Sequence, residues 1–210
     1  MKVISVYSIK GGVGKTAAAV NLAFLSARAV SEAIRGTDYE GFDLLPGDFS
    51  YRKFDVLLSE AEKAAKRFQR IKRRLEKDYD ALILDCSPGF TLISEVLLRL
   101  SDLILVPTVP TPLSLRSLEI IGRYFQKKKL GSQRVRPFFS MVDRRKSLHR
   151  SICEQAPETS FHFLEARIPY STFVERMGVY RAPLPTFAQR SRPARAFTEL
   201  WTEIGAELNL

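Results

Sequence analysis

The sequence predicts an α/β protein with a doubly wound, mostly parallel sheet and helices on both faces. Two observations carry this prediction. Short apolar runs rich in β-branched residues alternate with longer stretches of helical periodicity, and the first of these runs enters a helix through a glycine-rich loop. In such a sheet, ligands bind outside the carboxyl ends of the strands. The expected strands lie within Val3–Ser8, Tyr79–Asp85, Leu103–Thr108, Arg136–Asp143 and Ala166–Tyr170, and the expected helices are Ser94–Leu100, Leu113–Lys128 and Ser147–Gln155.

Composition favours one domain over residues 1–210. A chain of 210 residues with 45% hydrophobic residues can bury one sizeable core. No apolar run approaches the length of a membrane span, and Val3–Ile9 is too short for a signal sequence. Cys86 and Cys153 form no metal-binding spacing, and Cys86 is expected to be a buried free thiol. We therefore expect a cytoplasmic protein.

The glycine-rich loop is the main functional motif. Lys10–Thr16 fits G-x-x-x-x-G-K-[ST] if Ser8 takes the place of the first glycine, and it joins a strand to a helix. Glycines in such a loop let backbone N–H groups point at phosphate oxygens, and the dipole of the following helix adds to this field. Lys15 would neutralise the β- and γ-phosphates, and the Thr16 hydroxyl would bind Mg²⁺. The alternative is a glycine-rich turn without a ligand.

The motif K-G-G-x-G-K-T resembles the deviant P-loop of the ParA/MinD family of ATPases, in its ParA (partition) branch. The resemblance implies a P-loop NTPase fold of the deviant Walker A type, ATP or ADP as cofactor, and a dimer when ATP is bound. It implies that Lys10 reaches the nucleotide of the other subunit and that Lys10, Lys15 and Asp85 are catalytic. The nucleotide-binding residues that it implies are Lys10, Gly11, Gly12, Val13, Gly14, Lys15, Thr16, Ala17, Pro169 and Tyr170.

A second match to the family ends in Asp85. Tyr79–Pro88 is similar to the family's Y-D-x-x-x-x-D-x-P-P, with Ser87 in place of the first proline. An aspartate at the carboxyl end of a strand beside a P-loop can hold the Mg²⁺ shell, so Thr16 and Asp85 are the expected metal residues. The alternative role for Asp85 is a helix N-cap. By analogy with the family, the segment after Val142 and the turn at Pro169 and Tyr170 flank the adenine.

One departure from the family lies after the first helix. Members continue with a strand ending in D-x-D-P-Q, but here Asn21–Arg28 runs directly into Ala29–Arg35. As written, Thr16–Arg35 reads as one long helix ended by Gly36. Gly41–Asp48 resembles the strand that follows the missing one. A strand and its loop near residues 28–30 are therefore absent, either from the protein or only from this sequence.

Net charge is the second functional clue. The 33 Lys and Arg residues against 23 acidic residues give a net charge of +10, which favours a polyanion partner, although any single charge run is usually a solvated face. Relatives in the family bind DNA non-specifically through basic residues late in the chain. We therefore expect two basic clusters late in the chain to bind DNA, rather than a third cluster on the helix before Asp85. The expected DNA-binding residues are Arg144, Arg145, Lys146, Arg150, Arg190, Arg192 and Arg195.

The last helix distinguishes the branches of the family. Phe197, Leu200, Trp201, Ile204 and Leu208 give it one apolar face, while its polar face carries three glutamates that an anionic membrane would repel. We expect this helix to pack on the domain with Trp201 in the core, unlike the membrane-binding helix of MinD-like members. His149 and His162 have no partner at catalytic or metal spacing.

The sequence thus predicts a ParA-like ATPase, a weak hydrolase stimulated by a partner. ATP would make a dimer that binds non-specific DNA, associates with the nucleoid and positions a plasmid, chromosome or protein cargo through a ParB-like or cargo adaptor protein, without a membrane. The alternatives are a MinD-like regulator acting at a membrane or on a machine, and a nucleotide-binding scaffold with little hydrolysis. A small-molecule kinase or synthetase is the least favoured, because no second substrate site is visible.

Overall fold

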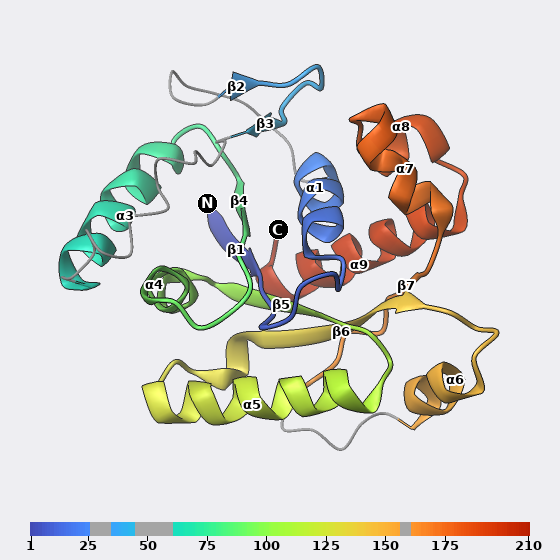
Figure 1. Ribbon diagram of the computed structural model, residues 1–210. Helices are drawn as coiled ribbons and strands as arrows, with labels where there is room; N and C mark the ends of the chain where they lie inside the picture. Colours follow the sequence, from blue (N-terminus) through green and yellow to red (C-terminus); the bar gives the residue numbers. More distant parts are fainter. Residues whose placement is uncertain (26–34, 45–60, 156–160) are drawn as a thin grey trace.

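The structure is a computed structural model of the 210-residue chain, and it describes residues 1–25, 35–44, 61–155 and 161–210. Its main sheet has five strands in the order β4-β1-β5-β6-β7, and every neighbouring pair is parallel (Figure 1). This confirms the predicted α/β class. The strands are β1 (Lys2–Val6), β4 (Ala81–Asp85), β5 (Leu103–Thr108), β6 (Val135–Val142) and β7 (Arg167–Pro169).

Helices cover both faces of this sheet. In Figure 1, α1, α8 and α9 lie on one side, and α5 and α6 lie on the other. The helix α3 lies beyond β4 and packs on α4. The helices are α1 (Lys15–Leu25), α3 (Ala61–Leu75), α4 (Leu92–Leu100), α5 (Pro112–Lys128), α6 (Ser147–Glu154), α7 (Thr172–Tyr180), α8 (Leu184–Ala188) and α9 (Arg192–Leu208), with a short 3₁₀ turn at Ser132–Arg134.

The core is divided by the sheet into two layers. All six residues of β5 are buried, as an interior parallel strand requires. On one face, Leu22 of α1 packs with Phe197 and Leu200 of α9, and on the other, Leu118 and Phe125 of α5 pack beside Leu98 of α4. The apolar face of α9 is therefore covered by its own domain, as predicted. Trp201 packs against this layer but is only half-buried, so the prediction that it lies in the core is only partly correct.

The ends of several helices follow from local chemistry. Thr91 and Ser94 form a reciprocal capping box at α4, and Thr111 caps α5 ahead of Pro112. Ser191 caps α9 by accepting from the Ala194 amide. The predicted boundaries of the strands and of the helices α4, α5 and α6 agree with the structure to within two residues.

The prediction of one helix over Thr16–Arg35 is wrong at its end. The helix α1 ends at Leu25, and Arg35 lies in β2 (Arg35–Gly36), which pairs antiparallel with β3 (Asp43–Leu44) in a separate ribbon. Periodicity alone did not reveal that backbone pairing had replaced the helix at Arg35. Ala29–Arg35 otherwise falls outside the described residues, as do 45–48 of the expected Gly41–Asp48 strand.

The strand β6 is irregular near its carboxyl end. Its register with β7 shifts between Phe139 and Val142, and Met141 has a positive φ of 56°. A left-handed backbone at a residue with a Cβ costs on the order of 1–2 kcal/mol. This bulge re-aims the residues that follow it, and Val142 and Asp143 lead directly into the turn between β6 and α6.

The side chain of Asn21 ties α1 to the loop before α8. It is fully buried, donates from Nδ2 to the carbonyl of Ala17 at 2.7 Å, and accepts at Oδ1 from the Leu184 amide at 3.0 Å. Its Nδ2 also lies 3.3 Å from the Met177 sulfur. One amide thus joins two segments that are far apart in sequence.

Asn21→Ala should destabilise the protein by about 2 kcal/mol, because the buried Leu184 amide then has no acceptor. For a chain of this size the melting temperature should fall by roughly 4–8 °C. Thermal unfolding of the nucleotide-free protein measures this loss. Gln189→Ala, which removes an exposed amide after α8, is the control and should change the unfolding free energy by less than about 0.5 kcal/mol. Equal melting temperatures for the two variants would contradict the assignment.

Candidate nucleotide site

The glycine-rich loop connects the end of β1 to the start of α1, at the carboxyl edge of the sheet. Gly12 and Gly14 have positive φ values of 70° and 86°, which side-chain-bearing residues rarely adopt. A Cβ on Gly14 would also lie 2.8 Å from Oγ of Ser140 on β6. The loop therefore lies directly against β6, and a side chain at position 14 would be strained by the backbone conformation and would displace the Ser140 hydroxyl.

Lys15 is the buried cation of this loop. It is 8% exposed, and its Nζ donates to the carbonyl oxygen of Lys10 at 2.7 Å. Burial lowers the pKa of its ammonium, while Asp85 acts in the opposite direction. No ion pair of Lys15 is found among the described residues, so its positive charge is available to an anion held by the loop.

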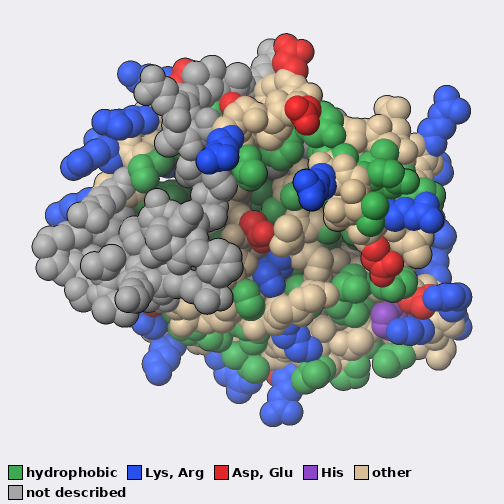
Figure 2. Space-filling model, turned by 45° about the horizontal axis from the view of Figure 1, so that its top comes forward, with side chains coloured by type: hydrophobic (Ala, Val, Ile, Leu, Met, Phe, Trp, Pro, Cys, Tyr) green, Lys and Arg blue, Asp and Glu red, His purple; other side chains and the backbone are tan. Residues whose placement is uncertain are grey.

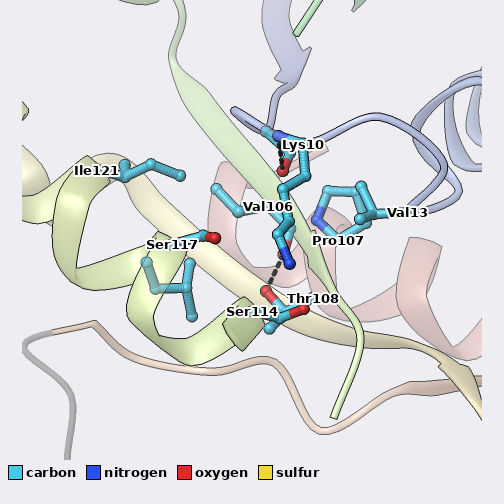
Figure 3. A pocket seen from close by; sticks show the side chains of 10 residues that line it. Lys10, Val13, Val106, Pro107, Thr108, Ser114, Ser117 and Ile121 are labelled. Carbon is cyan, nitrogen blue, oxygen red and sulfur yellow. Dashed lines mark hydrogen bonds between the residues drawn. The ribbon is translucent and has the colours of Figure 1, made fainter. Parts of the chain in front are cut away.

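The side chain of Lys10 lies between the loop and the start of α5 (Figure 3). It extends beside Val13, Thr108 and Ser114 in a cavity of about 10 Å³. Lys15 therefore contacts the backbone carbonyl of Lys10, whereas the Lys10 side chain lines the small cavity. The predicted role of Lys10 at a partner subunit stays a prediction.

Ser8 stands where the motif has its first glycine, and it has a structural role there. It is 4% exposed, and its Oγ accepts the amide of Lys10 at 3.2 Å. A serine can therefore stand where the pattern has glycine, because its side chain closes the loop over two residues, as serine hydroxyls do in turns.

Thr16 and Asp85, the two predicted metal residues, lie in contact, and their role at a metal stays a prediction. The Thr16 hydroxyl donates to Oδ2 of Asp85 at 2.8 Å, across the parallel pair formed by β1 and β4. A hydroxyl and a carboxylate side by side fit Mg²⁺, which takes oxygen ligands and keeps most of its coordination for phosphates and water. The N-cap role for Asp85 is wrong, because Thr91 caps the following helix α4.

The segment after Asp85 is held by aromatic contacts that the sequence analysis missed. The Tyr7 hydroxyl donates to the carbonyl of Gly89 at 3.1 Å, and the Phe90 ring stacks on Tyr124 of α5 with centroids 3.9 Å apart. Cys86 is a buried free thiol, as expected, and burial raises its pKa to about 11. A neutral thiol beside Asp85 adds no charge to the phosphate site.

The residues expected near the base gather at the ends of β6 and β7. The Tyr170 amide donates to the carbonyl of Val142 at 3.0 Å, and a cavity of about 450 Å³ is lined by Pro169, Tyr170, Asp143 and the two arginines that follow it. Pro169 and Tyr170 are thus brought together with the segment after Val142. Their contact with a base stays a prediction.

Asp143 is held in place by two neighbours. Arg145 donates to both of its carboxylate oxygens at 2.9 Å, and this pairing holds the pKa of Asp143 at about 2. The backbone amide of Asp143 donates to Nδ1 of the buried His149. His149 is therefore a structural residue, and burial lowers its pKa.

The predicted basic clusters are only partly brought together. Arg144, Arg192 and Arg195 line a common cavity of about 340 Å³, and Arg167 of β7, which the sequence analysis missed, joins them. Arg150 bonds the carbonyl of Arg144 instead. Lys146 and Arg190 are exposed and do not line this cavity. Lys and Arg side chains project along the rim of the face in Figure 2 and outnumber the acidic ones there. The alternation of exposed and buried residues along an edge strand could have suggested that Arg167 is exposed, since its neighbour Ile168 is buried.

Comparison with known proteins identifies the family of the chain. The profile of a family described as an AAA domain matches residues 23–134, more than half of the chain. A ParA family protein of Mycoplasma genitalium is 30% identical over 93 residues, which are 42% of this chain and 35% of that protein. This chain therefore spans about a third of the length of that curated relative.

Two further relatives match along the whole chain. The sporulation initiation inhibitor protein Soj of Bacillus subtilis is 22% identical and covers 98% of both chains. A putative plasmid partition protein of Borrelia burgdorferi, solved with AMPPNP, superposes with a TM-score of 0.78 at 18% identity, again with 98% of each chain covered. Among the described residues, no helix has the length and apolar character that a membrane crossing needs. The chain belongs to the AAA-domain family that its sequence matches, and its fold is similar to that of the ParA and MinD ATPases of known structure.

Proposed function

We propose that this chain is a ParA-like ATPase that dimerises on ATP, binds DNA non-specifically and positions or segregates a cargo. The observation that carries the proposal is the contact between Thr16 and Asp85 beside the buried Lys15. The proposal takes residues 1–210 as one ATPase domain, with a ParB-like or other adaptor linking the dimer to its cargo on the nucleoid.

Each residue of the site has a separate task in this proposal. Gly12 and Gly14 open the loop so that its amides face the phosphates, and Lys15 exchanges the Lys10 carbonyl for a phosphate oxygen. Thr16 and Asp85 would hold Mg²⁺, which would supply positive charge to offset the charge that develops on the phosphates. Tyr7 and Tyr124 hold the segment after Asp85 through Gly89 and Phe90, so that it keeps its place beside the metal.

The DNA part of the proposal is supported by the charge and placement of the late basic residues. The chain carries a net charge of +10, and Arg144, Arg192 and Arg195 meet at one cavity although they come from two separate segments. The exposed cations of α3 form a second basic surface on the far side of β4, and we expect this surface to contribute less.

Replacing Arg144, Arg145 and Arg150, or Arg190, Arg192 and Arg195, with glutamate should weaken duplex binding equally for all sequences. Binding in the presence of ATP, measured by fluorescence anisotropy over a salt series, should show a salt slope that falls by about one unit for each phosphate contact removed.

In the matched control, Lys66, Arg70 and Arg74 on α3 are replaced with glutamate, which changes the net charge by the same amount at a different surface. We expect the smaller loss there. Unchanged duplex affinity in both late sets, or a sequence-specific footprint, would contradict the DNA proposal. Vesicles of anionic lipid serve as the parallel arm, and ATP-dependent binding to them would favour a MinD-like regulator.

A second candidate is a nucleotide-binding scaffold with little hydrolysis. It is favoured by the absence of a D-x-D motif from the sequence between Asn21 and Arg35. The match to Soj runs over 249 residues, more than the 210 of this chain, so parts of that relative have no counterpart here. Phosphoryl-transfer enzymes contribute mainly positioning and charge stabilisation, so a site without an aspartate to position water should turn over very slowly.

Intact-mass spectrometry combined with phosphate release distinguishes the two candidates. We expect a mass above 23.8 kDa by the weight of a strand and loop, together with measurable hydrolysis in the presence of Mg²⁺ and DNA. A mass of 23.8 kDa with no phosphate release would instead support the scaffold, which would remain a persistent ATP-bound clamp.

A further inference from the structure

The cavity beside α9 carries an inference that deepens the proposed DNA binding and rests on it where the ligand is DNA. Four arginines, Arg144, Arg167, Arg192 and Arg195, line this cavity of about 340 Å³, and Glu199 is the only acidic residue in its lining. We infer that it is a phosphate-binding pocket, separate from the glycine-rich loop, in which Arg167 makes a direct contact with the bound phosphate.

Backbone pairing fixes where these arginines lie. Val142 at the end of β6 pairs with Pro169 of β7, which places Arg144 close to Arg167. The helix α9 packs on β7, and its first turn brings Arg192 and Arg195 to the same cavity. Three elements therefore supply the four guanidinium groups, and the site does not depend on the conformation of one loop.

The positive charges in this cavity outnumber the single negative charge of Glu199. Within residues 1–25, 35–44, 61–155 and 161–210, none of the four guanidinium groups makes an ion pair, whereas the adjacent Arg145 is paired with Asp143. Arg192 and Arg195 also stand at the amino end of α9, which has no acidic residue in its first turn. Cations are unfavourable at that end of a helix dipole, and like charges repel each other, so a bound anion would relieve both costs.

The chemistry of the lining suits a phosphate group. A guanidinium group presents a planar fork of N–H donors that matches two phosphate oxygens. Val142, Pro169 and Ala196 supply an apolar wall. A volume of about 340 Å³ lies at the lower end of the range for ligand cavities, so it fits a phosphate group with part of its carrier. The carrier is either the backbone of a duplex or a free phosphorylated molecule.

The test uses full-length protein saturated with Mg·ATP, so that the glycine-rich loop is filled. Duplex DNA is followed by anisotropy over a salt series, and inorganic pyrophosphate is titrated by calorimetry and as a competitor of the duplex. Arg167→Gln should lower duplex affinity about tenfold and reduce the salt slope by about one unit. Arg167→Lys, which keeps the charge but loses the fork, should recover part of the loss.

Arg176→Gln is the matched control, because it removes one arginine from an exposed position on α7 outside the cavity. It should change either affinity less than about twofold. An unchanged affinity for ATP shows that each variant is folded.

Two results support the pocket, and they identify its ligand. If pyrophosphate displaces the duplex and Arg167→Gln weakens both, the pocket holds a backbone phosphate. If only pyrophosphate binding depends on Arg167, the pocket takes a free phosphorylated molecule. If Arg167→Gln and Arg176→Gln bind both probes alike, the inference is overturned. Loss of duplex binding in the late glutamate variants would then still leave the proposed DNA function standing.

Discussion

Lys15→Ala should abolish ATP binding at concentrations that saturate the unaltered protein. Lys15 is a buried cation whose hydrogen bond is to the Lys10 carbonyl, so no other side chain of the loop carries positive charge to the same place. Contacts between a cation and a phosphate are each worth about 1.5–3 kcal/mol, which corresponds to a loss of tenfold to over a hundredfold in affinity. Equilibrium binding of a fluorescent ATP analogue measures it.

Lys127→Ala is the control for this variant, because it removes the same charge from an exposed site near the end of α5. ATP affinity should be unchanged in that protein. Normal affinity in Lys15→Ala would disprove the assignment of the glycine-rich loop as a phosphate site. A thermal unfolding profile close to that of the unaltered protein would show that lost binding does not come from unfolding.

Lys10→Ala should keep nucleotide binding but lose ATP-dependent dimerisation and turnover. The hydrogen bond between residue 10 and Lys15 uses the backbone carbonyl of residue 10, which alanine retains. The Lys10 side chain itself lines the small cavity next to α5, so its removal should leave the loop and its glycines in place (Figure 3). Binding of the ATP analogue and sedimentation with ATP or ADP measure the two properties separately.

The comparison of the two lysine variants decides the role of Lys10. If Lys10→Ala sediments as a dimer with ATP and releases phosphate at the normal rate, the side chain has no task at a partner subunit. If it loses affinity for ATP as strongly as Lys15→Ala, Lys10 acts on the nucleotide of its own chain instead.

The parallel sheet and the site at its edge were accessible from the sequence for a physical reason. Buried parallel strands need continuous apolar runs, and a phosphate loop needs glycines, a lysine and a threonine at fixed spacing. Both requirements are local, so the positions of β5 and of the Thr16–Asp85 contact followed from short segments.

What the sequence analysis missed depends on contacts between distant segments. Asn21 looks like an ordinary polar residue inside α1, and its task appears only when the loop before α8 is packed against that helix. Arg167 reads as an exposed position of a short edge strand until α9 places two more arginines beside it. The helix predicted through Arg35 failed because pairing with Leu44, nine residues later in an antiparallel strand, outweighed its helical periodicity.

The strained backbone of Met141 has a consequence for how the residues on either side of it influence each other. Ser140 lies against Gly14 of the glycine-rich loop, and Val142 and Arg144 line the cavity that holds four arginines. One residue with a left-handed backbone, Met141, therefore separates the two sites. A regular strand would act as a stiff rod that moves as one body. A residue held at an unfavourable φ can act as a hinge. A small displacement of the glycine-rich loop can release its strain by rotating one peptide plane. Occupancy of the phosphate loop is therefore expected to change the direction in which the arginines point more than their distance from the sheet.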